Sequence, residues 1–294
     1  MACKRLFFLL ACLFTFRLSG QGYTDIVSFG TEYFPLEAGG EKFGGTRSAL
    51  NVLLPVALSK EKSGYLLTGL NADAIRFADA PETFGSDRFF GFSPVVGYTG
   101  PLPKNYKVTA IFTPFLNGDF KRAGDRDFRL AGFVRLAKKE TESFTWRITV
   151  GYRQQFFGPQ YVFLAGIDWK ASDRLRLFGD LPQQFTASYR CGEQVHAGLS
   201  YVANLFSYDV SGQSRYFRYS YVHSGLFSEF SLTEAIILRA DAGYSFTRKF
   251  EVFDDADRPD ATLIFFQIGN KPVPLNAPLQ KGLVFRLSLS YRVF

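Results

Sequence analysis

LVFRLSLSYRVF, residues 283–294, closes the chain and decides its fold. Every second residue from Leu283 to Val293 is apolar, and four of the five residues between them are polar. This two-residue period is that of a β-strand with one apolar and one polar face. About ten residues is also the length of a strand that crosses a bilayer. An aromatic last residue, here Phe294, is usual at the end of outer-membrane β-barrels. The segment therefore predicts the closing strand of such a barrel.

The same alternation recurs along the chain. It is strong in segments 128–131, 144–153, 161–170, 195–204 and 236–247. It is weaker in segments 25–35, 46–58, 63–77, 88–100, 106–116, 175–178, 184–191 and 215–232. Short turns alternate with longer polar or glycine-rich stretches at 37–45, 79–87, 117–126 and 254–282. Short periplasmic turns and longer outer loops are the rule for bacterial barrels. We expect residues 254–282 to form the largest outer loop and to fold over or into the barrel mouth.

The number of strands follows from the placement of the termini. If both termini lie in the periplasm, the number of strands must be even. Dividing residues 173–191 into two strands at Leu181-Pro182 gives 14 strands in a consistent up-and-down order. We therefore predict an all-β fold, an up-and-down antiparallel transmembrane β-barrel of about 14 strands formed by residues 21–294. A barrel of 12 strands is the alternative.

Hydropathy is consistent with this fold. The mean hydropathy is −0.02, and outside the first twenty residues no apolar run is long enough for a transmembrane helix. A barrel gives such an average because each strand is half lipid-facing and half lumen-facing. The 34 phenylalanines would supply the lipid-facing band and its aromatic girdles. A soluble two-sheet β-sandwich, which would bury the same residues, is the main rival.

The first residues resemble a cleaved Sec-type signal peptide at positions 1–20. Lys4 and Arg5 precede the apolar run 6–16, and small residues follow. Cleavage after Gly20 leaves Gln21 first, and cleavage after Gly22 is the alternative. Cys12 loosely matches a lipidation site, but the apolar run continues beyond it. An export signal and a barrel together predict location in the bacterial outer membrane.

Charge and cysteine content exclude several classes of protein. Cys191 is the only cysteine left after removal of the signal, so neither an intramolecular disulfide nor a cysteine metal cluster can form. Loss of the signal's three cations lowers the formal charge from +7 to +4. This modest excess does not indicate a nucleic-acid partner. We expect neither a cofactor nor a metal.

Three short motifs carry a resemblance to a known family. Residues 166–170 read Gly-Ile-Asp-Trp-Lys, Leu181-Pro182 follows, and a strand surrounds Tyr189. With these motifs and a signal followed by glutamine, the chain resembles a family of outer-membrane β-barrels of unknown function from Bacteroidota-type bacteria. The resemblance implies fold and location, but no activity. One departure concerns recognition by the barrel-assembly machinery, because Phe294 lies one residue out of register with the apolar series that ends at Val293.

If the apolar faces meet lipid, the alternate residues face the lumen. The lumen-facing candidates are Arg129, Arg135, Arg147, Arg153, Asp168, Lys170, Arg190, His196, Arg239, Asp241 and Arg286. Alternation adds Lys249, Arg292, Glu32 and Glu251 to this face. Bases outnumber acids, which favours a wet, basic lumen open to small anionic solutes. The alternative is a lumen closed by ion pairs and aromatic side chains.

Catalytic and metal sites receive little support from the sequence. His196 shares a face with Ser200, but four strand residues separate them by roughly 13 Å, beyond hydrogen-bond reach. Four aspartates between residues 254 and 260 lack the spacing of a calcium loop. We expect no enzyme, and a passive channel or solute-binding barrel that contacts outer-membrane lipid and the barrel-assembly machinery. The alternatives are a non-conducting structural or surface-interaction barrel, and a hydrolase or acyltransferase that uses His196.

Overall fold

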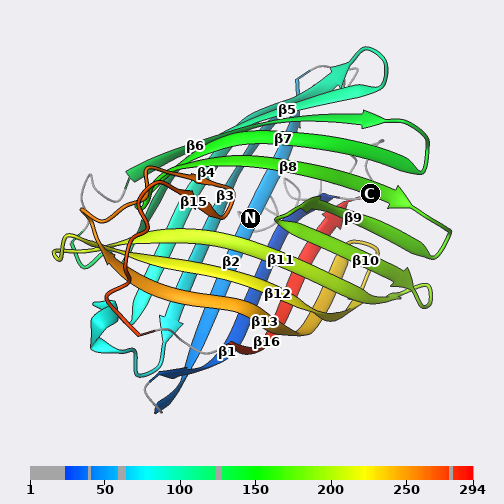
Figure 1. The fold of residues 1–294 in the computed structure, drawn as a ribbon. Helices are drawn as coiled ribbons and strands as arrows, with labels where there is room; N and C mark the ends of the chain where they lie inside the picture. The colour runs from blue at the N-terminus through cyan, green and yellow to red at the C-terminus, as the bar shows by residue number, and fades with distance from the viewer. Residues whose placement is uncertain (1–23, 39–40, 59–63, 123–127, 278–280, 294) are drawn as a thin grey trace, which may run out of the picture.

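The computed structural model describes residues 24–38, 41–58, 64–122, 128–277 and 281–293 (Figure 1). The expected signal peptide and Phe294 lie outside these residues. The strands of the barrel wall are β1 (Thr24–Ala38), β2 (Glu41–Ala57), β3 (Tyr65–Phe77), β4 (Arg88–Leu102), β5 (Tyr106–Gly118), β6 (Phe128–Lys139), β7 (Phe144–Gln155), β8 (Gly158–Lys170), β9 (Leu175–Leu181), β10 (Gln184–Arg190), β11 (Val195–Val210), β12 (Arg215–Ser231), β13 (Ile236–Asp254) and β16 (Gly282–Val293). A short hairpin, β14 (Ala261–Leu263) and β15 (Phe266–Ile268), lies in the last long loop.

The 14 wall strands form one closed antiparallel sheet. Each strand pairs with the next along the chain, and β16 joins β13 to β1. The pairing of β8 with β9 completes the circle. The predicted 14-stranded barrel is confirmed, including the division at Leu181-Pro182, and both the 12-strand count and the β-sandwich are wrong. Because Thr24 pairs with Val293, the two ends of the wall lie together at what we call the terminal end, and the opposite end is the loop end.

The outer face of the wall is an apolar band between two aromatic levels. On β16, Leu283, Phe285, Leu287 and Leu289 are all exposed, as alternation predicts. Trp146 and Trp169 mark the level near the terminal end, and Tyr152 packs on Tyr161 nearer the loop end. Aromatic girdles of this kind flank the hydrocarbon region of outer-membrane barrels. Within the described ranges the one short helix is η1 (Glu82–Phe84), and no helix there could cross a bilayer.

Two expectations about individual segments are wrong. Residues 37–45 are not a long loop, because β1 and β2 continue as a paired hairpin to Ala38 and Glu41. In β13, the pairing shifts by one residue at Phe246, between the partners of Val222 and His223. This β-bulge reverses the faces beyond it. Arg248 is therefore the buried, inward residue, while Lys249 is largely exposed.

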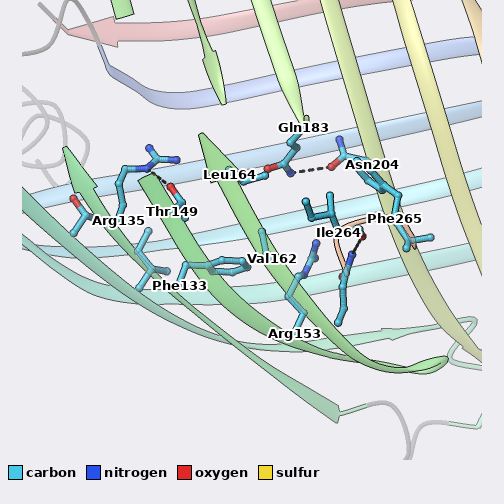
Figure 2. Close-up of a pocket in the computed structure, with 14 residues that line it drawn as sticks. Phe133, Arg135, Thr149, Arg153, Val162, Leu164, Gln183, Asn204, Ile264 and Phe265 are labelled. Atoms are coloured by element: carbon cyan, nitrogen blue, oxygen red, sulfur yellow. Dashed lines mark hydrogen bonds between the residues drawn. The ribbon is translucent and has the colours of Figure 1, made fainter. Parts of the chain in front are cut away.

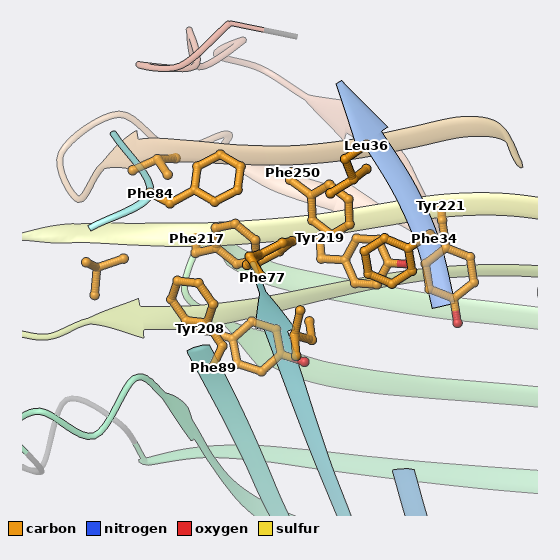
Figure 3. Close-up of a cluster of buried hydrophobic side chains, with 13 residues drawn as sticks. Phe34, Leu36, Phe77, Phe84, Phe89, Tyr208, Phe217, Tyr219, Tyr221 and Phe250 are labelled. Atoms are coloured by element: carbon orange, nitrogen blue, oxygen red, sulfur yellow. The ribbon is translucent and has the colours of Figure 1, made fainter. Parts of the chain in front are cut away.

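The lumen of the loop end is filled by aromatic side chains (Figure 3). Phe89 stacks on Phe217 with ring centroids 4.1 Å apart, and Tyr219 stacks on Phe250 at 4.4 Å. These rings have almost no exposed surface. The loop end of β11 also crosses the lumen and pairs with β5, where Asp209 lies opposite Gly118. The clustered rings and this crossing strand together close the axis of the barrel at the loop end. We call the cluster of buried side chains the plug; it consists of Phe34, Leu36, Ile75, Phe77, Phe84, Phe89, Tyr208, Val210, Phe217, Tyr219, Tyr221, Phe250 and Val252.

Candidate solute-binding lumen

The terminal half of the lumen is hollow. Two adjoining cavities of about 850 and 450 Å³ share Phe178, Glu229, Ile237 and Arg292 in their linings. We call the two together the vestibule. Its basic lining residues are Arg47, Lys170, Arg174, Arg176, Arg190, Arg239, Arg286 and Arg292, and its acidic ones are Asp25, Glu32, Glu142, Asp173 and Glu229.

Ion pairs neutralise much of this basic surface. Arg286 Nη2 lies 3.0 Å from Glu32 Oε2, and Glu32 is almost fully buried. Arg292 Nε lies 2.7 Å from Asp25 Oδ1, and its Nη2 lies 3.5 Å from Glu229. These pairs join strands that meet only because the barrel closes. Buried charges require such partners, so these arginines hold the wall together.

Arg239 and Asp168 are also paired. Arg239 donates to both carboxylate oxygens of Asp241, at 2.9 and 2.6 Å. Asp168 accepts two hydrogen bonds from Arg176, at 2.8 and 2.6 Å. Bidentate pairs of this kind fix both side chains. These charges shape the vestibule wall and contribute little net field.

Lys170 and Arg190 differ from the paired residues. Both line the vestibule, and no carboxylate lies within ion-pair distance of either among the residues that the structure describes. They lie near the turns of the terminal end, where they meet solvent. At the same rim, the ammonium of Lys139 donates to Glu142 and lowers the pKa of that carboxyl. Arg174 lines the vestibule too and has no carboxylate at ion-pair distance in the described ranges, so Lys170, Arg174 and Arg190 are the lining cations left without one.

His196 lines the vestibule between Arg190 on β10 and Glu229 on β12. Ser188 lines the same cavity, and Ser200 lies further along β11. No hydrogen bond joins His196 to either serine within the described part of the chain. Ser200 donates instead to Asp241, at 3.2 Å. The residues around His196 do not form a nucleophile and base arrangement.

Arg135 and Arg147 converge on one carboxylate, that of Asp180. Arg147 Nε lies 2.6 Å from Asp180 Oδ1, and Arg135 Nη2 lies 3.2 Å from Oδ2. Arg147 also donates to the carbonyl of Gly179, at 3.1 Å. The trio fastens the end of the short strand β9 to β6 and β7. Asp180 is beyond the end of the strand segment predicted there, so alternation did not reveal it.

A separate cavity of about 270 Å³ lies deeper in the barrel, against β5 to β8 (Figure 2). We call it the chamber. Phe133, Val162, Leu164, Leu205 and Phe265 give it apolar walls. A hydrogen bond of 3.1 Å from Gln183 to Asn204 lies toward the vestibule, and Asn204 lines both spaces.

Arg153 is the unpaired cation of the chamber. No hydrogen bond or ion pair of its guanidinium is formed among the described residues, and its Nε is buried without a partner. Figure 2 shows Arg153 between Val162 and Ile264, directed into the cavity. Arg129, by contrast, lies over the ring of Phe156, 4.1 Å from the centroid.

Three residues that sequence reasoning missed complete the lumen. Arg47, on the weakly alternating strand β2, lies 3.9 Å from Asp73 and lines the vestibule. Glu229, on β12, contacts both Arg239 and Arg292. Asp180 is the third. Strand β12 gave little signal because aromatic residues occupy both of its faces near the loop end.

The acidic part of the last loop makes protein contacts. Asp257 accepts hydrogen bonds from the side chain of Asn270 and the backbone of Val273. Asp255 lies 3.2 Å from Arg258. No cluster of three or more metal-ligating side chains is present in the described ranges. Part of this loop joins the wall, because β14 pairs in parallel with β8.

The closed sheet, the apolar outer band and the hollow interior define a membrane-spanning β-barrel of the outer-membrane type. The chain belongs to the family described as "Domain of unknown function (DUF6268)", whose model matches residues 73–256. The expected resemblance to a family of unknown function is thereby confirmed. No curated protein matches the sequence.

Several solved structures are similar to this chain over most of their length. The Pseudomonas putida toluene transporter TodX is 7% identical, with 94% of this chain and 90% of TodX covered and a TM-score of 0.44. An outer membrane channel from Pseudomonas putida F1 is 10% identical, with 94% and 100% covered and a TM-score of 0.40. The translocator domain of autotransporter NalP from Neisseria meningitidis is 12% identical, with 99% and 94% covered and a TM-score of 0.37. The strand pairing of this chain by itself defines the barrel.

Proposed function

We propose that this protein is a passive outer-membrane barrel that binds and admits small anionic solutes through the vestibule. The observation that carries the proposal is the hollow, basic lining of the terminal half, with eight basic and five acidic side chains around adjoining cavities of about 850 and 450 Å³. Rings of Arg and Lys favour anions in pores. A barrel that served only as a scaffold would be expected to fill this space with paired side chains.

The fold supports a proposed orientation and proposed partners. Most of the turns at the terminal end are short, and the longest loop lies at the other end, as in bacterial barrels whose termini face the periplasm. The vestibule would then open to the periplasm. Outer-membrane lipid would cover the apolar band, and the barrel-assembly machinery would insert the chain after export by the Sec-type signal.

The plug determines how the barrel would behave at rest. Because aromatic rings fill the lumen at the loop end, a solute that enters the vestibule does not pass straight along the axis. The resting protein is therefore a solute-binding barrel rather than an open pore. If a mutation opens the plug, the ion selectivity of the vestibule can be measured as a reversal potential.

The test is single-channel recording in planar bilayers under a salt gradient. Phe89→Ala/Phe217→Ala removes the closest ring stack of the plug. We expect no steady openings from the native protein, and steady openings with an anion-selective reversal potential from this variant. Adding Lys170→Gln and Arg190→Gln should move the reversal potential toward zero. Lys249→Gln, on the exposed side of β13, is the matched control and should leave it unchanged.

Folding must be checked for each variant. A heat-dependent shift in gel mobility reports an intact barrel. If the opened variant is folded but conducts without preference for anions, the proposal is refuted. The same holds if Lys249→Gln changes the selectivity as much as the vestibule substitutions do.

A further inference from the structure

The barrel wall is incomplete between β8 and β11. Strands β9 and β10 have seven residues each. Toward the loop end they reach only Leu181, where β9 ends, and Gln184, where β10 begins. The partner of Leu181 on β8 is Ala165, which lies four residues from Trp169 and four from Tyr161. Because Trp169 and Tyr161 mark the two aromatic levels, the wall provided by β9 and β10 ends about midway across the apolar band. The loop-end half of the wall lacks both strands.

The β14–β15 hairpin occupies the missing part of the wall. β14 pairs in parallel with β8, at Thr262 opposite Gln160 and Leu263 opposite Tyr161. The inner side of the hairpin faces the chamber, because Phe265 at its tip is part of the chamber lining. Its exposed apolar side chains continue the lipid-facing band; they are Leu263, Phe266 and Ile268.

The hairpin is attached to the wall along one edge. β15 is the end of the sheet and pairs with no wall strand in the described ranges. At the tip, the Ile264 N–H donates to the Tyr161 carbonyl and the Gln160 side chain donates to the Ile264 carbonyl, both at 2.7 Å. Ile264 has a φ of 58°, a left-handed conformation that strains a β-branched residue. Because its tip is strained and held by few hydrogen bonds, the hairpin is suited to detach from β8 and to pair with it again.

The chamber behind the hairpin has an amphipathic lining. Phe133, Leu164 and Phe265 form apolar walls, while Arg153 presents an unpaired guanidinium. A buried guanidinium with no carboxylate at ion-pair distance is costly, and an anionic ligand would supply a direct partner. Arg135 also lines the chamber, but its guanidinium lies 3.2 Å from Asp180, so Arg153 is the chamber cation without an ion pair. Apolar walls with a few placed polar groups are typical of pockets for small organic ligands.

We propose that the chamber binds a small amphiphile with an anionic head group, and that the β14–β15 hairpin is a lateral door between the chamber and the membrane. Arg153 would hold the head group, and the apolar walls would hold the tail. Rupture of the Gln183–Asn204 hydrogen bond would connect the chamber to the vestibule. The proposal does not depend on the anion preference of the vestibule.

Binding is tested with radiolabelled octanoate and equilibrium dialysis of the full-length protein in nanodiscs, with 1-octanol as the uncharged probe. Arg153→Met keeps most of the side-chain volume and removes the charge. We expect it to weaken octanoate binding by about tenfold or more, the size of one charge-assisted hydrogen bond, and to leave octanol binding unchanged. Lys249→Met, on the exposed side of β13, is the matched control and should bind octanoate like the native protein. Equal octanoate affinity of the native protein and Arg153→Met, or no binding to either, overturns the proposed site.

The door is tested by a reversible crosslink in a Cys191→Ser background. Tyr161→Cys/Leu263→Cys joins register partners of β8 and β14, both on the exposed face. We expect the oxidised protein to take up octanoate at least tenfold more slowly than the reduced protein. Val150→Cys/Phe163→Cys joins β7 to β8 on the same face and is the matched control, with equal rates in both states. Equal uptake by oxidised and reduced Tyr161→Cys/Leu263→Cys protein overturns the lateral door.

Discussion

Arg147 and Asp180 provide the sharpest test of which lumen charges are structural. Their side chains are 11% and 5% exposed, and their closest atoms are 2.6 Å apart. Removing one member of a buried pair leaves the other uncompensated, at a typical cost of about 3–5 kcal/mol. Asp180→Asn retains a hydrogen-bond acceptor and the shape of the side chain, so we expect a loss of about 3 kcal/mol. We expect a similar loss for Arg147→Met.

The double variant separates a true pair from two independent residues. With both charges gone, the cost should be about 3–4 kcal/mol instead of the sum of the two, a coupling of about 2–3 kcal/mol. Arg135 still lies beside position 180 but is 36% exposed, so water can solvate its charge.

Denaturant unfolding in lipid vesicles provides the measurement. The two tryptophans, Trp146 and Trp169, lie on β7 and β8 beside the pair and report its loss by fluorescence. Arg190→Met, a lumen arginine without a carboxylate, is the control and should change the free energy of unfolding by less than about 0.5 kcal/mol. Coupling below about 0.5 kcal/mol would refute the reasoning and make Arg147 a solvated lumen cation.

Two further predictions test the faces of the wall. Leu287→Arg, on the lipid face of β16, should destabilise the barrel by about 2–4 kcal/mol in the same unfolding assay, whereas Ser288→Arg, one residue away in the vestibule lining, should be tolerated. Equal costs would contradict the inward placement of position 288. Arg248→Met should cost about 3 kcal/mol, because its guanidinium donates to three backbone carbonyls, while Lys249→Met should cost less than about 0.5 kcal/mol. The opposite ranking would show that alternation continues through β13 without a bulge.

Alternation predicted the barrel because lipid imposes a simple rule on each strand. Leu283 to Leu289 shows the rule most clearly, since every second residue there is apolar and exposed. The rule fails where another protein segment replaces lipid. Tyr216, on β12, is buried against Phe253 rather than exposed, because the last loop covers that face. Near the loop end both faces of β12 are therefore aromatic, and the period of two is lost.

Charge pairing was only partly accessible from the sequence. The excess of bases over acids in the lumen is a property of composition, and it predicted a basic interior. Which base lacks a partner is a property of the closed barrel. Arg286 meets Glu32 from 254 residues away, and Arg147 meets Asp180 on a strand beyond its own neighbour. Arg153 remains unpaired although its sequence pattern is the same as that of Arg147.

By itself, the sequence determined the outer surface, the number of strands and the inward side of most of them. Each of these depends on the local period and on whether each residue meets lipid or not. Only the tertiary structure decided that the loop end is plugged, that the bulge at Phe246 turns Arg248 inward, and that a hairpin stands in for the missing wall beside β8. These features arise inside the barrel, where residues far apart in the chain share one space, as Phe89 and Phe217 do. The alternation of apolar and polar residues along one strand does not indicate which distant side chain each residue will contact.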